Sequence, residues 1–501
     1  MHTFASPLQR AAAVAGDHPA VVCGTTTLTY AQTADRCGRL AGALLGLGLQ
    51  KGDRVAVVAL NCHRYLELYQ AVPAAGLVLV PLNTRHTEAE LRYALTDSRT
   101  RVLVTDRDPG GLAEVVERVV RIDTGEYDAL LAVDPVELGT TVTENDLAGL
   151  FYTGGTTGAA KGVMLTHRNL VANTIHGLIA IGLQPEDRWL AMAPMFHAAG
   201  TFASLATVWL GATHVVLPAF DPVAALDLVE AQRCTATIAV PAMLAALNEE
   251  QAVRPRDTSS LRVLTHGAAP VATEVLRRAH VLFPSAELIH LYGATETAPL
   301  VTASRHEERL LDTPQGRSCG QPLVGVEVRV LDPLGQPIAV GDVGEVAVRG
   351  PNVMQGYWEK PAETAAALVG GWYRSGDLGR IDEQGYLYLV DRAKDMVVTG
   401  GENVYCTEVE EALYAHAAVL EAAVFGVPDD RWGEAVHAVV VPRKPVTEQE
   451  LTDHCRVLIA GYKVPKRIEV RAEPLPKSGA GKVLKRELRE PHWAGRDSRI
   501  G

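Results

Sequence analysis

The chain has 501 residues, 47% of them hydrophobic, and its 59 acidic against 47 basic side chains give a formal net charge of -12. This composition is ordinary for a globular protein and excludes a disordered chain, a collagen-like repeat and a disulfide scaffold. The acidic balance weighs against a nucleic-acid-binding protein, whose affinity would depend on neutralising phosphates. At roughly 150 residues per domain, the length corresponds to about three core-forming units.

The seven cysteines are scattered along the chain and form no C-x-x-C pair. This pattern favours neither a zinc site nor a disulfide framework, and it fits a reducing compartment. The first residues, MHTFASPLQR, lack the cationic start and apolar run of a signal peptide. We therefore expect a cytoplasmic protein.

The stretch 189–220 contains no Asp, Glu, Lys or Arg, but prolines and glycines interrupt it. A membrane-spanning helix needs about 20 predominantly apolar residues. We therefore expect a buried helix and strand that line an apolar cavity, and no transmembrane segment.

Short β-type runs alternate with helical patterns in two parts of the chain. Strands are predicted over 53–60, 77–82, 101–105, 235–240, 261–265 and 286–292, and helices over 63–74, from Thr87 and from Thr273. Such alternation predicts an α/β fold with largely parallel sheets. The segment 134–146 predicts an exposed acidic loop between them.

From residue 320 the sequence changes to strands punctuated by Gly and Pro, which predicts a small β unit. After LYLVDRAKD a separate core begins, so we place a domain boundary near residue 394, between domains 1–393 and 394–501. In the second domain, two helix starts are predicted by capping-box spacing, Thr407 to Glu410 and Thr447 to Glu450. Two apolar strands are expected between them, at 419–427 and 435–441.

A glycine-rich loop, FYTGGTTGAAKG, occupies residues 151–162. Glycines let backbone amides approach phosphate oxygens, while threonine hydroxyls and a lysine add donors and charge. The loop is not a Walker A motif, because Ala160 and Gly162 stand where that motif needs Gly and Ser or Thr. Taken alone, the loop is also compatible with a structural turn.

The loop resembles the (Y/F)TSGTTGxPKG signature of the adenylate-forming, or AMP-binding, superfamily of acyl-CoA synthetases, peptide adenylation domains and beetle luciferases. Gly154 and Ala160 depart from the signature, where Ser and Pro are usual. Further family-like motifs follow in order: PMFHAAG (194–200), HGAAP (266–270), LYGATETAP (291–299), GEVAVRGPNVMQGYW (344–358), WYRSGDLG (372–379), DRAKDMVVTGGENVYCTEVE (391–410) and PKSGAGKVLKREL (476–488). The resemblance implies a large N-terminal domain of two α/β subdomains plus a small β unit, followed by a small mobile α+β C-terminal domain.

The resemblance also implies roles for individual residues in binding ATP and Mg²⁺. The β- and γ-phosphates would be bound by Thr153, Gly155, Thr156, Thr157, Gly158 and Lys161. Adenine would lie beside Gly267, Ala268 and Ala269. Tyr292 would stack on adenine, Thr295 would contact the α-phosphate, and Glu296 would bind Mg²⁺, as an oxygen donor suited to a hard cation.

Three more residues complete the implied adenylation site. Asp377 resembles the carboxylate that accepts the ribose hydroxyls, Arg392 the cation near the ribose and α-phosphate, and Lys482 the group that stabilises charge on the reacting oxygens. Without the motifs, each residue has an alternative structural interpretation. Asp377 could be a turn residue, Glu296 an acid at a helix start, and Lys482 a surface lysine.

The second half-reaction is implied to use another arrangement of the C-terminal domain. That domain would rotate about Lys394, withdraw Lys482 and bring Gly400 and Gly401 to the acyl adenylate, where a β-carbon would obstruct a pantetheine tunnel. The CoA nucleotide would be received by Trp432, Lys463 and Lys466, residues that alone are compatible with ordinary surface positions.

His197 in PMFHAAG is expected to face the acyl channel, although a hydrogen-bonded core histidine is the alternative. The rest of the wall is expected from Phe196, Ala198, Gly200, 241–244, His290, Ala294, Thr297 and Ala298. No Arg or Lys lies there to pair with a second carboxylate, and no Asp stands in 194–200 to pair with an amino group.

We therefore expect an acid–thiol ligase that activates an uncharged fatty or aryl monocarboxylic acid with ATP and Mg²⁺ and transfers the acyl group to coenzyme A. A ligase that loads a carrier-protein thiol is the alternative, and a nucleotide-binding protein without catalysis is a third hypothesis. A homodimer is compatible with the sequence.

Overall fold

The computed structural model describes residues 3–153, 160–269, 271–392, 395–429, 431–477 and 483–493. Its contacts divide the chain into two compact units. The first comprises Met1–Val328 and Val348–Arg374, and the second Arg329–Ala347 and Ser375–Gly501. The second unit thus includes residues before 394. The predicted boundary at residue 394, between two domains that rotate relative to each other, stays a prediction.

Within the described residues, the first unit contains a nine-stranded sheet. Its strands, in spatial order, are β15 (Gln321–Pro322), β14 (Thr302–Arg305), β13 (Glu287–Tyr292), β12 (Val263–Gly267), β11 (Ala236–Ala239), β9 (Arg188–Ala191), β10 (Thr213–Val216), β1 (Pro19–Cys23) and β2 (Thr26–Thr29). Neighbours run parallel from β13 to β1 and antiparallel at both ends. This confirms the prediction of largely parallel pairing.

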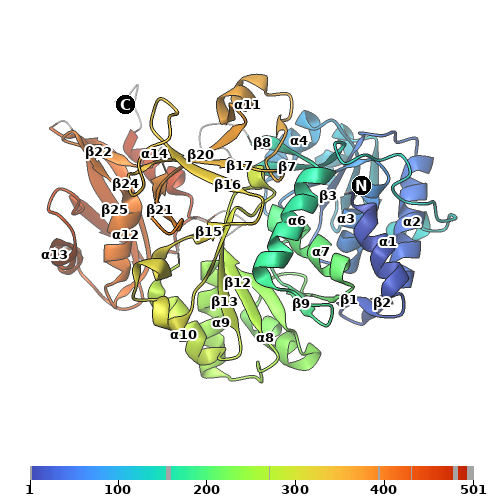
Figure 1. Cartoon of the computed structure of the whole chain (residues 1–501), viewed down its shortest axis with the longest axis horizontal. Helices are drawn as coiled ribbons and strands as arrows, with labels where there is room; N and C mark the ends of the chain where they lie inside the picture. Colours follow the sequence, from blue (N-terminus) through green and yellow to red (C-terminus); the bar gives the residue numbers. More distant parts are fainter. Residues whose placement is uncertain are drawn as a thin grey trace. The chain divides into compact units, whose positions relative to one another are not determined.

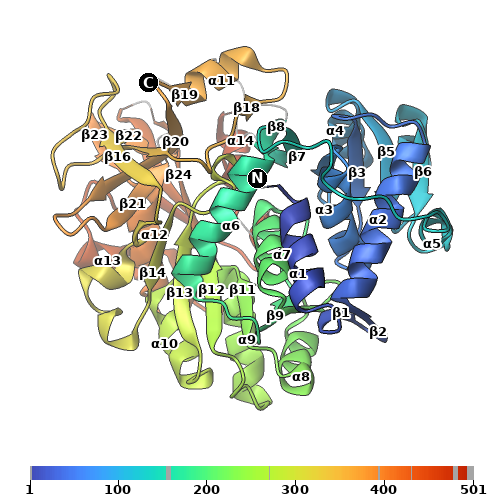
Figure 2. The ribbon, with the colours of Figure 1, turned by 45° about the vertical axis from the view of Figure 1, so that its right-hand side comes forward.

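Helices cover both faces of this sheet (Figure 1). Side chains alternate between faces along a strand, and Leu190, Val215 and Leu264 point toward α8 (Pro222–Gln232), α9 (Pro241–Val253) and α10 (Thr273–Leu282), with which they form one apolar core. The opposite face packs on α7 (Ala198–Leu210). Figure 2 shows α1 (Ala5–Val14) and α6 (His167–Ile181) beside α7.

The stretch without acidic or basic residues therefore forms β9, α7 and β10, a buried helix between two strands, as predicted. In the part of the chain that the structure describes, no helix combines the length and the apolar character needed to cross a bilayer.

A second sheet of the first unit has seven strands among the described residues. They are β18 (Gly356–Tyr357), β8 (Lys161–Thr166), β7 (Leu147–Thr153), β4 (Val78–Pro81), β3 (Arg54–Val58), β5 (Thr100–Thr105) and β6 (Arg118–Arg121). The predicted helix over 63–74 is α3 (His63–Ala74), and α4 (Glu88–Asp97) begins with a capping box at Thr87.

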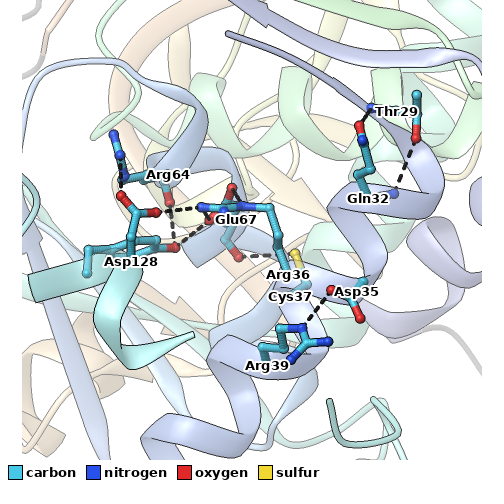
Figure 3. A network of polar contacts seen from close by, with 10 residues as sticks. Thr29, Gln32, Asp35, Arg36, Cys37, Arg39, Arg64, Glu67 and Asp128 are labelled. Carbon is cyan, nitrogen blue, oxygen red and sulfur yellow. Dashed lines mark hydrogen bonds and ion pairs between the residues drawn. The ribbon is translucent and has the colours of Figure 1, made fainter. Parts of the chain in front are cut away.

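A network of ion pairs around the buried Glu67 joins α3 to α2 (Tyr30–Gly46) and α5 (Glu126–Leu130), as Figure 3 shows. Glu67, of which 1% of the side chain is exposed, pairs with Arg36 at 2.7 Å, and the Tyr127 hydroxyl donates to it at 2.8 Å. Asp128 joins Arg36 to Arg64. Removing one partner of a buried pair leaves a charge without compensation, so loss of Arg36 would leave the Glu67 carboxylate of α3 without its ion pair.

The described residues also form two five-stranded sheets. One has the order β16 (Glu327–Leu331), β17 (Gly344–Arg349), β20 (Trp372–Ile381), β19 (Leu368–Val369), with β21 (Leu387–Arg392) beside β20. The other has the order β23 (Glu402–Val404), β22 (Val397–Thr399), β25 (Gly433–Pro442), β24 (Val419–Asp429), with β26 (Arg467–Val470) beside β25. The second sheet packs on α12 (Cys406–Tyr414) and α13 (Glu448–Leu458) around one apolar core.

One of the two predicted capping boxes in this unit is wrong. α13 begins with the box at Thr447, whose side chain accepts from the Glu450 amide. α12 instead begins at Cys406 without a side-chain cap. Glu410 accepts a hydrogen bond from the Val424 amide at 2.8 Å and pairs with Lys485 at 2.7 Å. Its carboxylate therefore contacts β24 and α14 (Lys485–Trp493) and does not cap the first turn of α12.

Candidate active site

The two ends of the glycine-rich loop lie side by side on the β7–β8 hairpin. Thr153 ends β7 and is the register partner of Lys161, which begins β8. Gly155, Thr156, Thr157 and Gly158 lie outside the described residues. The hairpin nevertheless brings one hydroxyl and one ammonium group to the two ends of the loop, as a phosphate site requires.

Glu296 lies close to this hairpin through Tyr357. The Tyr357 hydroxyl donates to the Glu296 carboxylate at 2.9 Å, and the Lys161 ammonium lies 4.4 Å from the centre of the same ring. Burial and the Glu296 charge both raise the pKa of Tyr357, so this phenol stays protonated and keeps its donor. Three segments far apart in the sequence therefore meet at one buried ring.

Asparagines hold the backbone around Glu296. The Asn352 amide donates to the carbonyl oxygens of Thr297 at 2.9 Å and Leu300 at 3.0 Å, and Asn173 donates to Leu300 at 2.7 Å. The Met354 amide donates to the Glu296 carbonyl at 2.9 Å. Buried asparagines with several partners rigidify a turn, and these residues were missed by motif reasoning.

The predicted adenine-binding residues lie at the carboxyl ends of β12 and β13. Gly267 is the register partner of Leu291, and Tyr292 is the last residue of β13. A β-carbon at Gly267 would lie 2.1 Å from the Leu291 carbonyl oxygen, and Ala268 has a φ of 69°. The absent side chain therefore lets β12 and β13 approach closely, and ligands of parallel α/β sheets bind at this edge.

The PMFHAAG loop is anchored by two buried residues from outside the motif. Asn61 donates to the Ala193 carbonyl at 3.0 Å and accepts from the Met195 amide at 2.8 Å. Tyr69 of α3 donates to the Met195 carbonyl oxygen. The loop leads into α7 with His197 at its N-cap, and the rings of Phe196 and His197 are 4.6 Å apart.

A small, mostly apolar cavity lies between α7 and the nine-stranded sheet. It is lined on α7 by Ala199, Gly200, Ala203 and Ser204, and on the loop and sheet by Ala193, Met195, Trp189, Ala191, His214 and Ile238. The sequence predicted an apolar cavity lined by a helix and a strand of 189–220. Of the residues expected to form the acyl wall, Gly200 lines this cavity, whereas Phe196, Ala198, 241–244, Ala294, Thr297 and Ala298 do not. No Asp, Glu, Lys or Arg is among the residues that line it.

The prediction for His290 is wrong. Its ring stacks on His266 with centroids 5.1 Å apart and lies 5.2 Å from His306. His290 is the register partner of His266, which in turn pairs with Ala239, a residue of the α8–α10 core. Since Ile238 lines the cavity and neighbouring residues point to opposite faces, His290 lies on the far side of the sheet.

In the second unit, Asp377 and Arg392 are register partners on β20 and β21 and form an ion pair at 3.3 Å. The Ser375 hydroxyl donates to the Val346 carbonyl at 2.7 Å and accepts from the Asp377 amide at 3.1 Å. The carboxylate and the guanidinium that the motifs assign to the ribose are thus neighbours across a strand pair.

Gly400 and Gly401 form the turn between β22 and β23, with φ values of 60° and 84°. The Gly400 amide donates to the Trp432 carbonyl at 2.8 Å, and a β-carbon on Gly400 would lie 2.7 Å from the indole ring. Trp432, with 40% of its surface exposed, therefore packs directly against Gly400. Two residues predicted to serve the second half-reaction are brought together.

The lysines predicted for the second half-reaction differ in their surroundings. Lys463 donates to both oxygens of Glu408, at 2.7 and 2.8 Å. Lys466 is exposed just before β26, and its amide donates to the Val436 carbonyl at 2.8 Å. Lys394 and Lys482 lie outside the described residues.

Comparisons with known proteins connect this geometry to a family. The AMP-binding enzyme model matches residues 8–358, and the AMP-binding enzyme C-terminal domain model matches residues 408–482. The chain belongs to the AMP-binding enzyme family. Feruloyl-CoA synthase of an Amycolatopsis species is 42% identical over 477 residues, which are 94% of this chain and 95% of that protein.

Two further relatives of this family member cover nearly the whole chain. The long-chain-fatty-acid–CoA ligase of Bacillus subtilis is 34% identical over 97% of this chain and 94% of its own length. The structure of o-succinylbenzoate CoA synthetase from Bacillus subtilis in complex with its acyl-adenylate intermediate has a TM-score of 0.88 and 31% identity, covering 99% and 98% of the two chains.

This AMP-binding enzyme is an AMP-forming acid–thiol ligase. It activates a carboxylic acid with ATP, which yields an acyl adenylate and pyrophosphate, and then transfers the acyl group to coenzyme A with release of AMP. The large N-terminal and smaller C-terminal α/β parts match the fold of the family.

The residues present fit the Mg²⁺ ion that this reaction uses. Within the described ranges, no group of three or more His, Cys, Asp and Glu side chains could hold a metal ion alone. Glu296 offers one carboxylate close to Lys161. A single carboxylate suits Mg²⁺, which commonly takes one or two protein carboxylates and completes its shell with phosphate oxygens and water.

Proposed function

We propose that this ligase acts on an uncharged aryl monocarboxylic acid, the aryl member of the two classes that the sequence favours. The cavity beside α7 carries the proposal. Its lining is uncharged and includes Trp189 and the small residues Ala199, Gly200 and Ala203. Small helical residues present an apolar wall to an acyl group, whereas a second carboxylate or an ammonium group beside them would be buried without a partner. The 42% identical relative named feruloyl-CoA synthase supports an aryl acid.

For the first half-reaction we assign the phosphates to Thr153, Lys161 and the loop between them, and adenine to Tyr292 beside Gly267. The attack of a carboxylate on a phosphate brings two anions together, so positioning and electrostatic stabilisation carry most of the catalysis. Glu296 would hold Mg²⁺, which would supply positive charge to the phosphates. Thr295, next to Glu296 on the same turn, would donate to the α-phosphate.

We assign the ribose hydroxyls to Asp377 and Arg392, and the charge that develops on the reacting oxygens to Lys482. The C-terminal part would turn about Lys394 between the two half-reactions, which exchanges Lys482 for the Gly400–Gly401 turn. Trp432, packed on that turn, would then meet the CoA nucleotide together with Lys463 and Lys466. His197 would mark the carboxylate end of the acyl site.

The substrate assignment is tested by a panel of aryl, fatty and dicarboxylic acids, with pyrophosphate release and acyl-CoA formation measured separately. Aryl acids should give the highest kcat/KM, and preference for fatty acids or dicarboxylates would overturn the assignment. Acyl adenylate without acyl-CoA would point to a carrier-protein thiol as the acceptor.

The two-state assignment is tested by Lys482→Ala and Lys394→Pro. Lys482→Ala should lose acyl-adenylate formation and still convert supplied acyl adenylate to thioester. Lys394→Pro should do the reverse, because proline fixes φ at the hinge. Equal loss of both steps in Lys482→Ala, or normal thioester formation in Lys394→Pro, would contradict these roles.

We also place the protein in the cytoplasm, because all seven cysteines are free and such thiols fit a reducing compartment. Cell fractionation tests this placement. The homodimer stays a prediction, for which sedimentation equilibrium is the measurement.

A further inference from the structure

Asp97, the last residue of α4, contacts the β7–β8 hairpin beside the glycine-rich loop. The Tyr152 hydroxyl, from β7, donates to its Oδ2 at 2.7 Å, and the Lys360 ammonium lies 3.3 Å from its Oδ1. The Tyr93 hydroxyl also donates to Oδ1, at 3.4 Å, and the Trp358 indole donates to the Asp97 carbonyl oxygen at 3.0 Å. One aspartate therefore joins α4 to two other segments of the first unit.

The same aromatic residues lie against both ends of the glycine-rich loop. Tyr152 and Gly162 are the residues just outside Thr153 and Lys161, and they pair in register on the hairpin. A β-carbon on Gly162 would lie 3.2 Å from the Tyr152 ring and 3.4 Å from the Trp358 β-carbon. The Trp358 amide also donates to the Gly162 carbonyl oxygen at 2.8 Å. The two aromatic residues that the aspartate contacts therefore also contact the residues that flank the loop.

The carboxylate of Asp97 is partly shielded from solvent and has three donors. Its side chain is 15% exposed, and that of Lys360 is 22% exposed. Burial and the Asp97 charge both raise the pKa of Tyr152, so this phenol stays protonated and keeps its donor. Hydrogen bonds to an ionised group are about twice as strong as neutral ones. Asp97→Asn would therefore keep the shape of the contact and lose much of its strength.

The composition of the loop makes its ends important. The seven residues between Thr153 and Lys161 are three glycines, two threonines and two alanines. Glycine restricts the backbone least of all residues, and side chains this small bury little apolar surface. The position of the loop relative to the hairpin therefore depends on how firmly its two ends are held.

We propose that Asp97 is a positioning residue for the first half-reaction, and that it holds Thr153 and Lys161 where they bind the β- and γ-phosphates of ATP. This inference rests on the proposed function, which assigns those phosphates to these two residues. Asp97 acts through Tyr152 and Trp358 and not by contact with the nucleotide. Since a misplacement of about 1 Å can cost about a hundredfold in rate, a small shift of the two ends is enough to weaken phosphate binding.

The test measures the two half-reactions of Asp97→Asn and Tyr152→Phe separately. Each variant should raise the KM for ATP by about tenfold, as expected for the loss of a hydrogen bond to a charged group, and leave the KM for the acid unchanged. In the reverse direction the KM for pyrophosphate should rise by the same factor. Thioester formation from supplied acyl adenylate should keep the wild-type rate, because that step involves no β- or γ-phosphate. The double variant should raise the KM for ATP no more than the stronger single variant, because both remove one contact.

Tyr127→Phe is the matched control. The Tyr127 hydroxyl also donates to a carboxylate that pairs with a cation, Glu67 beside Arg36, and none of these three residues lies on the hairpin or on β18. Its KM for ATP should equal that of the wild type, and a rise equal to that in Tyr152→Phe would overturn the role of Asp97. An unchanged KM for ATP in Asp97→Asn and Tyr152→Phe, or an equal loss of both half-reactions, would overturn it as well.

Lys161→Ala separates this inference from the proposed function. If Lys161→Ala leaves the KM values for ATP and pyrophosphate unchanged, the phosphate assignment fails and this inference with it. If Lys161→Ala raises both values while Asp97→Asn and Tyr152→Phe do not, only the role of Asp97 fails. If Asp97→Asn does not fold, Tyr152→Phe decides by the same measurements.

Discussion

Tyr357 donates a 2.9 Å hydrogen bond to Glu296 while its ring lies 4.4 Å from the Lys161 ammonium. Tyr357 belongs to β18, which pairs with β8 just after the glycine-rich loop. One phenol therefore sets the position of the carboxylate assigned to Mg²⁺ relative to the lysine assigned to phosphate. We regard Tyr357 as a positioning residue, since it acts through both neighbours.

Tyr357→Phe should lower the rate of adenylate formation by about ten- to a hundredfold, because hydrogen bonds to charged groups contribute about 1.5–3 kcal/mol. The Mg²⁺ concentration for half-maximal rate should rise, while thioester formation from supplied acyl adenylate should be unchanged. Tyr388→Phe is the control, since Tyr388 also donates to a carboxylate, Asp382, but elsewhere. An unaltered Mg²⁺ dependence would show that Tyr357 does not position Glu296.

Gly400→Ala should impair thioester formation and spare adenylation. The new β-carbon would lie 2.7 Å from the Trp432 ring, so the indole must move. Gly385→Ala separates this clash from backbone strain, because Gly385 also has a positive φ, of 81°, but open space around it. We expect a rise in KM for CoA of about tenfold or more, as for a displaced binding group. If Gly385→Ala raised the KM for CoA as much as Gly400→Ala, the contact between Gly400 and Trp432 would have no specific role in CoA binding.

Asn61→Ala should raise the KM for the acid and destabilise the fold by about 1–3 kcal/mol, the cost of leaving buried polar groups without partners. Asn61 is 4% exposed and donates to the carbonyls of Ala193 and Leu217 at 3.0 and 3.1 Å. Asn248→Ala, at a buried asparagine that holds Val275, should destabilise without changing the KM. Urea unfolding and acid titration of both variants distinguish the two effects.

Asp391, the residue before Arg392, gives the second unit a pH-dependent stability. Burial raises its pKa from 3.8 to about 6, against the opposing charge of Lys485. Since the folded state favours the protonated carboxyl, the stabilising contribution is complete below about pH 4 and is lost as the pH rises through about 6. The free energy of unfolding of Asp391→Asn, relative to the wild type, should rise by about 2 kcal/mol between pH 4 and 7. A difference that does not vary with pH would refute the assignment.

Sequence reasoning predicted the parallel sheets, the helix over 63–74 and the buried helix in 189–220, because periodicity and capping are local. It also predicted that Asp377 and Arg392 serve one site, since both lie in ordered motifs. It did not predict Asn61, Asn173 or Asn352, because a buried asparagine carries no local pattern and its partners are carbonyls more than 50 residues away.

The prediction that His290 lines the acyl site was wrong for a related reason. The motif places it two residues before Tyr292, but which face of β13 it occupies depends on the pairing with β12 and on the core beneath. The capping box predicted at Thr407 was wrong because the Glu410 carboxylate binds partners in β24 and α14 instead. In both cases contacts between distant segments decided between two locally acceptable arrangements.

The wall that α7 presents to the cavity consists of the small residues Ala199, Gly200, Ala203 and Ser204 on a regular helix, and Asn61 and Tyr69 anchor the loop that leads into it. The shape of this wall is therefore set by the volumes of side chains on a helix, and not by the conformation of a loop. Adding one or two methyl groups at Ala199 or Ala203 should shorten the accepted acid stepwise, so redirecting this ligase to smaller substrates calls for single substitutions and no loop exchange.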